Sequence, residues 1–110
     1  MSLFQIDAGK EWRGGQRQAL LLGKELQKKG YPFYFYVQTG SPLHEKAAQA
    51  GLPVYPIKIS SEMDMTAILQ LAWAMRRKKC ILVHYHDAHS AAIGAAAAKL
   101  AKVPLRILSR

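Results

Sequence analysis

Cysteine and long hydrophobic runs are scarce in this chain of 110 residues. Cys80 is the only cysteine, so no intrachain disulfide can form, as is usual in a reducing compartment. No apolar run approaches the roughly 18 residues that a membrane-spanning helix needs. The first residues also lack the basic start and apolar stretch of a secretory signal. We therefore expect one cytoplasmic domain over residues 1–110, with enough hydrophobic residues to form a core.

Acidic residues are scarce too. The chain has 16 Lys and Arg but only 7 Asp and Glu, which gives a formal net charge of +9. Cations near the carboxyl ends of helices are ordinary, because the helix dipole favours them there. The total nevertheless favours an anionic partner, such as nucleic acid, an anionic lipid surface or a phosphorylated ligand.

The common nucleotide-binding signatures are missing. The chain has no GxGxxG fingerprint, and its second predicted strand ends in Val37-Gln38-Thr39 without an acidic residue for a ribose. It also lacks the GxxxxGK[ST] phosphate loop. A dinucleotide-dependent dehydrogenase and a P-loop hydrolase are both disfavoured.

What the sequence does contain is a regular alternation of strand and helix patterns. Strands are expected at residues 3–7, 31–37, 54–59, 81–86 and 103–108, and helices at 14–29, 43–50 and 91–100. A further helix, the third in chain order, is expected after residues 61–64. In the third helix, the residues expected to face a core are Ile68, Leu69, Leu71, Ala72 and Met75. This alternation predicts a Rossmann-like α/β fold, with a parallel sheet between two helical layers. Right-handed crossovers predict strand order 3-2-1-4-5, so the order reverses between the first and fourth strands.

The first polar cluster, Trp12-Arg13-Gly14-Gly15-Gln16, opens the first helix. Free N–H groups and the positive end of the helix dipole make Gly14 and Gly15 a candidate phosphate seat, which Arg13 and Gln16 can extend by hydrogen bonding. A plain tight turn is the alternative interpretation. Trp12 fits either a lid over a ligand or a hydrophobic plug.

The second cluster follows the fourth strand and contains His84, His86, Asp87 and His89. His84 and His86 are two residues apart and point to the same face of the strand. We expect His84 to lie deeper, as a core residue, and His86 and Asp87 to lie at the mouth of a crevice. A His–Asp pair there can orient and deprotonate a hydroxyl. The cluster also suggests a metal site, but no second group of ligands completes a shell, so we predict none.

In this order, these segments resemble the N-terminal half of retaining GT-B glycosyltransferases of family 4. The segments that carry the resemblance are Trp12–Gln16, Leu20–Gly30, Gly40–Leu43, Ala50–Val54, Val83–Asp87, Val103–Pro104 and Ser109–Arg110. Such enzymes have two domains of similar size, and the second supplies most of the donor site. The resemblance therefore implies an incomplete N-terminal, acceptor-side domain that is inactive alone.

The resemblance also implies roles for the two clusters. Gly14 and Gly15, with Gln16, would lie near the donor diphosphate. His86 would lie by the reacting sugar and Asp87 near the acceptor, and these two are the candidate catalytic residues. Trp12, Arg13, His84 and His89 would contact the acceptor. No metal or other cofactor is implied.

Two function classes follow. The preferred hypothesis is part of a hexosyltransferase that moves a sugar from a nucleotide-sugar donor to a cell-envelope or lipid-linked acceptor, such as a lipopolysaccharide precursor. Its positive charge suits docking on the inner face of an anionic membrane. The alternative is a stand-alone basic module that binds an anionic ligand or nucleic acid without catalysis. The aromatic residues 31–36 fall in a strand expected to be buried, which argues against nucleic acid, and a metal-dependent hydrolase rests only on the His cluster. We also expect the isolated chain to self-associate through its fifth strand.

Overall fold

The computed structural model describes residues 2–10, 14–59 and 64–108. Five parallel strands form one sheet in the order β3-β2-β1-β4-β5. The strands are β1 (Ser2–Asp7), β2 (Phe33–Gln38), β3 (Val54–Ile57), β4 (Cys80–Tyr85) and β5 (Leu105–Leu108). The helices are α1 (Gly14–Lys28), α2 (Pro42–Gln49), α3 (Met65–Arg77) and α4 (Ala88–Ala101). The predicted fold and strand order are both confirmed.

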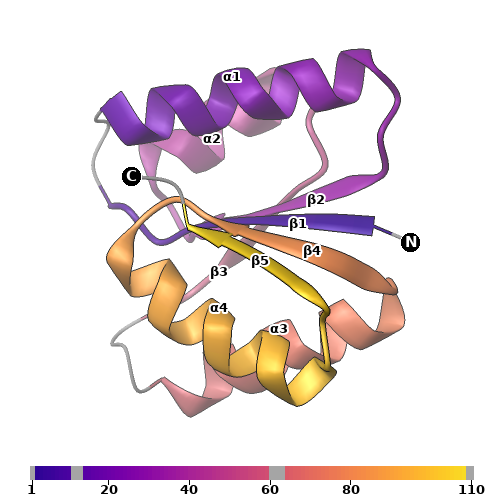
Figure 1. The fold of residues 1–110 in the computed structure, drawn as a ribbon. Coiled ribbons are helices and arrows are strands. Elements are labelled where there is room, and N and C mark those ends of the chain that lie inside the picture. The colour runs from indigo at the N-terminus through magenta and orange to yellow at the C-terminus, as the bar shows by residue number, and fades with distance from the viewer. Residues whose placement is uncertain (1, 11–13, 60–63, 109–110) are drawn as a thin grey trace.

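The sheet lies between two helical layers, with α1 and α2 on one face and α3 and α4 on the other (Figure 1). Alternate residues of each strand point to opposite layers. Phe4 and Ile6 of β1 are fully buried with Val83 and Tyr85 of β4 on the α3/α4 side. Phe33, Phe35 and Val37 of β2 pack toward α1 and α2 on the other side.

The helix starts follow from local chemistry. Ser41 is the N-cap of α2, where its hydroxyl accepts from the His44 N–H at 3.2 Å, and Pro42 occupies the first turn. Asp64 caps α3 in the same way, accepting from the Ala67 N–H at 3.1 Å. Both residues are short polar side chains in extended backbone just before a helix, which is the arrangement that the sequence predicts for Ser41.

Three details of the sequence analysis are wrong. Leu69 does not face the core but is 56% exposed, because it lies four residues from Met65 and from Trp73 on the outward line of α3. Tyr31 lies before β2 and is 57% exposed, because its N–H bonds the Leu26 carbonyl and closes the end of α1. The last helix begins at Ala88 rather than at residue 91. None of the helices in the described ranges is both long and apolar enough to cross a membrane.

Candidate functional site

Parallel pairing of β1 with β4 brings the two strand ends together. Gln5 lies opposite His84 and Ile6 opposite Tyr85. The pairing continues one residue beyond β4, since the His86 N–H donates to the Ile6 carbonyl at 3.0 Å. The side chains that follow both strands are thereby held at one edge, at the point where the strand order reverses. Ligands of open parallel sheets bind at such points.

His84 of β4 and His86, which directly follows the strand, form a partly buried pair. Their ring centroids are 4.3 Å apart, and His86 also lies 6.4 Å from the Phe35 ring. The His86 Nε2 is hydrogen-bonded to Oε1 of Gln5, which is fully buried. His84 is therefore not the core residue that the sequence predicts. It stays partly exposed because α1 and α2 pack mainly on β1, β2 and β3, leaving this face of β4 more open.

Asp7, at the end of β1, organises the turn that leads to α1. Its Oδ1 accepts from the Gly9 N–H at 2.8 Å and from the Gln16 amide at 3.2 Å. A Cβ added at Gly9 would overlap the Gln16 amide, so a larger residue there would displace the Gln16 side chain. Asp7 is 1% exposed, and within the described part of the chain its Oδ2 has no hydrogen-bond partner. The strand end and the first turn of α1 are thus fixed to each other.

Asp87 makes the corresponding connection from β4. Its Oδ1 accepts from the Ala8 N–H at 3.0 Å, so the second residue after β4 holds the residue after β1. Asp87 is also the N-cap of α4, where its backbone N–H donates to the hydroxyl of buried Ser90 at 3.2 Å. Two carboxylates, Asp7 and Asp87, therefore accept hydrogen bonds from backbone N–H groups of the turn that follows β1.

Burial sets the protonation of this site. It raises the pKa of Asp7 to about 6, and the Asp87 charge adds to the effect, while the Gly9 N–H and the Gln16 amide oppose it. Burial lowers the pKa of His86 to about 4, with a further contribution from His84, and it lowers the pKa of His84 as well. At neutral pH, His86 is therefore a neutral imidazole, and the Asp7 carboxyl is mostly ionised.

The structure brings together part of the predicted site. His84, His86, Asp87 and Gln16 meet at one edge, and Gly14 and Gly15 open α1 beside them. Trp12 and Arg13 lie outside the described residues. His89 lies in the first turn of α4, but its side chain is not among those described.

Sequence reasoning missed Gln5 and Asp7, the two residues that hold His86 and Gln16. The signal that could have found them is their alternation with Phe4 and Ile6 in a central strand. Polar residues at alternate positions of a buried strand must have polar partners. Among the described side chains, no group of three or more His, Cys, Asp or Glu is arranged to hold a metal ion.

Several solved structures share this fold. They include MurG from Acinetobacter baumannii (TM-score 0.76, 20% identity), a glycosyltransferase from Rickettsia africae (0.77, 15%) and HepE from Anabaena in complex with UDP (0.76, 14%). Each comparison covers 96% of this chain, but only 34% of MurG and 28% of each of the other two proteins. At this identity the likeness establishes the fold, and the chain spans about a third of the length of these proteins.

Sequence comparison identifies the family. No curated protein matches the chain significantly. The model of Glycosyltransferase Family 4 matches residues 12–107, which is most of the chain and includes both polar clusters. The chain belongs to glycosyltransferase family 4, with the GT-B N-terminal fold that its sequence predicts.

Proposed function

We propose that the chain is the acceptor-side domain of a two-domain, retaining hexosyltransferase that uses a nucleotide-sugar donor and a cell-envelope or lipid-linked acceptor. The observation that carries the proposal is the convergence of His86, Asp87, Asp7 and the start of α1 at the β1/β4 edge. Family membership supports transfer of a sugar, and the UDP complex of a protein with the same fold supports a nucleotide-linked donor.

The start of α1 is our candidate for the donor diphosphate. Glycine at Gly14 and Gly15 leaves the first N–H groups of a 15-residue helix open to close approach, and the helix dipole favours an anion there. Gln16 is held by Asp7, so it is oriented before a ligand arrives. We expect Gly15→Val to weaken binding of the donor nucleotide, because a branched side chain would block that approach.

His86 is our candidate for contact with the reacting sugar. With a pKa near 4 it is a weak base at neutral pH, so its role is to position a hydroxyl rather than to hold a proton. Its Nε2 faces the side-chain Oε1 of Gln5, which favours the tautomer with the proton on Nε2 and leaves Nδ1 as an acceptor. Asp87 fixes the adjoining turn and supplies negative charge next to it.

The test is His86→Ala in the full-length protein. Loss of a positioned polar group of this kind costs roughly 10²- to 10⁴-fold in rate, and we expect a loss in that range for transfer from radiolabelled nucleotide sugars to membrane lipid extracts. His44→Ala on α2 is the matched control, because His44 bonds only its own helix start among the described residues. Transfer by the His86 variant within twofold of the wild type, with an unchanged circular dichroism spectrum, would contradict the assignment.

A further inference from the structure

Gln5 of β1 is bonded to His86 at one end of its amide and leaves the other end without a partner. Its Oε1 is hydrogen-bonded to the His86 Nε2, whereas its Nε2 is buried and has no hydrogen-bond partner among the described residues. A glutamine amide can turn over and exchange its oxygen and nitrogen, and a histidine ring nitrogen can donate or accept. The contact alone therefore fixes neither the amide orientation nor the histidine tautomer, so a further group has to decide both.

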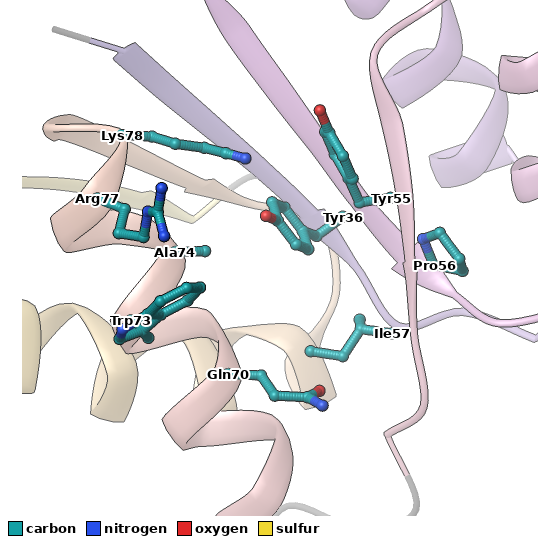
Figure 2. Close-up of a pocket in the computed structure, with 9 residues that line it drawn as sticks. All are labelled: Tyr36, Tyr55, Pro56, Ile57, Gln70, Trp73, Ala74, Arg77 and Lys78. Carbon is teal, nitrogen blue, oxygen red and sulfur yellow. The ribbon is translucent and has the colours of Figure 1, made fainter.

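Two other glutamines show what is unusual about Gln5. Gln38 is also buried, but its Nε2 donates to the Ile59 carbonyl at 2.9 Å and its Oε1 accepts from the Ile59 N–H at 2.8 Å. Backbone groups cannot exchange donor for acceptor, so the Gln38 amide has one orientation. Gln70 is exposed and extends from α3 at a pocket of about 550 Å³ between α3 and β3 (Figure 2). Gln5 is buried like Gln38, yet it meets a ring nitrogen that can take either role.

The surroundings of His86 make its tautomer important. Its ring centroid lies 4.3 Å from that of His84 and 6.4 Å from that of Phe35, so the ring has little room to turn. A neutral imidazole has one donor and one acceptor nitrogen. Because Nε2 is bonded to Gln5, the position of the single proton decides whether Nδ1 offers an acceptor or a donor to a ligand.

Asp7 is the group that can set the Gln5 amide. It follows Gln5 by two residues in β1, so both side chains lie on the same face of the sheet, roughly 7 Å apart along the strand. The Asp7 Oδ1 already accepts from the Gly9 N–H and the Gln16 amide, whereas Oδ2 is buried without a partner in the described ranges. The observed orientation of Gln5 therefore leaves a donor and a charged acceptor on this face, which attract each other. The opposite orientation would leave two acceptors, which repel, and this field is little screened between buried groups.

We propose that Asp7 and Gln5 are positioning residues that act in series on His86. The Asp7 charge sets the orientation of the Gln5 amide, and the amide oxygen then holds the His86 proton on Nε2, so that Nδ1 accepts from a hydroxyl of the reacting sugar. Neither residue needs to touch the substrate. The inference deepens the proposed function and rests on it for its purpose, but the tautomer is measured without any transfer reaction.

The experiment is 15N NMR of the histidine rings in the 110-residue chain at mildly alkaline pH, where the rings are neutral. Protonated and unprotonated ring nitrogens have well-separated signals, and those of His86 are identified by their loss in His86→Gln. We expect a protonated Nε2 and an unprotonated Nδ1 in the wild type. Gln5→Leu and Asp7→Asn should each produce a mixture of the two tautomers. Gln38→Leu is the matched control, a buried glutamine on the other face of the sheet, and should leave the His86 signals unchanged.

A double variant separates positioning from packing. Glutamate is close to glutamine in size but offers only oxygen atoms to His86, so Gln5→Glu should keep the proton on Nε2 without help from Asp7. Gln5→Glu combined with Asp7→Asn should therefore restore the tautomer that Asp7→Asn alone loses. No such rescue is expected if Asp7 only fixes the turn through Gly9 and Gln16.

Transfer by the full-length protein tests the purpose of this arrangement. Gln5→Leu and Asp7→Asn should each lower kcat about tenfold, the lower end of what loss of an orienting partner of a histidine costs at metal sites, and should change KM less than about twofold. Asp7→Asn is the more informative variant, because removal of a buried charge should not destabilise the fold. Gln38→Leu should keep the wild-type kcat.

Four results would overturn the proposal: a wild-type His86 with its proton on Nδ1, a tautomer that Asp7→Asn does not change, no rescue by the double variant, or full transfer despite an altered tautomer. Asp7→Asn and the double variant decide the matter even if Gln5→Leu fails to fold. If His86→Ala leaves transfer intact while the tautomer responds as expected, the proposed function fails, but control of the His86 tautomer by Asp7 and Gln5 stands.

Discussion

The same two strands, β1 and β4, present opposite chemistry to the two helical layers. Toward α3 and α4 they place Phe4, Ile6, Val83 and Tyr85, all of which are buried in one apolar cluster. Toward α1 and α2 they place Gln5, Asp7 and His84, and His86 follows directly after β4. His86 is hydrogen-bonded to Gln5 and its ring contacts that of His84, while Asp7 is bonded to Gln16. We call these the apolar face and the polar face of the β1/β4 pair.

The comparison separates stability from chemistry within a single pair of strands. The apolar face is stabilised by burial of aromatic and aliphatic area, which needs no particular partner. On the polar face, burying a polar group costs free energy unless that group gains a hydrogen-bond partner. Two buried atoms of this face, Asp7 Oδ2 and Gln5 Nε2, have no partner among the described residues. Residues that reduce stability in a central strand are candidates for function.

The largest expected effect comes from removing the main aromatic side chain of the apolar face. Phe4 is fully buried, with its ring 5.1 Å from that of Tyr36 and 5.6 Å from that of Tyr34. Phe4→Ala should lower the free energy of unfolding by about 3–5 kcal/mol, as is typical of a buried aromatic residue. His84→Ala, on the polar face of the neighbouring strand, should lower it by less than about 1 kcal/mol. Urea unfolding followed by circular dichroism measures both, and equal losses would contradict the division into two faces.

Sequence periodicity was sufficient to predict the fold, because each strand and helix is long enough to show its own hydrophobic pattern. It also located the end of β4 to within one residue, since a polar cluster that begins at His84 directly follows the apolar run 81–83. Periodicity could not identify Asp7 as a site residue, because aspartate is also common in the turns that follow strands. Nothing local reveals that Asp7 meets Gln16 and lies near Asp87, since both relations depend on the packing of separate elements. Leu69 was assigned to the core because α3 is apolar on both sides, so the pattern alone does not tell which side is covered.

Replacing the buried carboxylate should stabilise the protein at neutral pH. The pKa of Asp7 is about 6 in the folded chain against 3.8 for a free carboxyl, so the ionised form is disfavoured by folding. Asp7→Asn keeps an oxygen for the Gly9 N–H and the Gln16 amide and removes the charge. We expect a gain of about 1–2 kcal/mol at pH 7 in urea unfolding. Asp64→Asn at the start of α3 is the control and should hardly change the free energy of unfolding, because aspartate and asparagine are equally good N-cap residues. A loss at Asp7 would mean that its charge is satisfied in the folded state.

The pH dependence of stability should expose two opposing groups on the polar face. Because the folded pKa of Asp7 is raised, its contribution is greatest below about pH 4 and is lost as the pH rises through 6. The folded pKa of His86 is lowered to about 4, so its contribution is present above pH 6.5 and is lost as the pH falls toward 4. The two changes largely cancel in the wild type.

Single variants should separate these two contributions. Between pH 6.5 and 4, thermal melting should show Asp7→Asn losing stability and His86→Gln gaining it, each relative to the double variant as baseline. The expected difference is about 1–2 kcal/mol in each direction. If the stability of both single variants changed in the same way between pH 6.5 and 4, neither Asp7 nor His86 would have the shifted pKa described above.

The smallest effect should come from Ser90, which supports the polar face from α4. Its buried hydroxyl accepts from the Asp87 N–H at 3.2 Å and donates to the Asp87 carbonyl at 3.0 Å. Ser90→Ala should cost about 1 kcal/mol, because the Asp87 N–H loses its partner while the helix remains otherwise intact. Ser2→Ala is the matched control: that hydroxyl is also buried and donates to the Lys78 carbonyl at 2.7 Å, but it lies at the opposite end of β1. Both variants should lose similar stability. Only Ser90→Ala should speed hydrogen exchange at the Ala8 N–H, because that N–H donates to the Asp87 carboxylate. Unchanged exchange at Ala8 would show that Ser90 does not hold Asp87 in place.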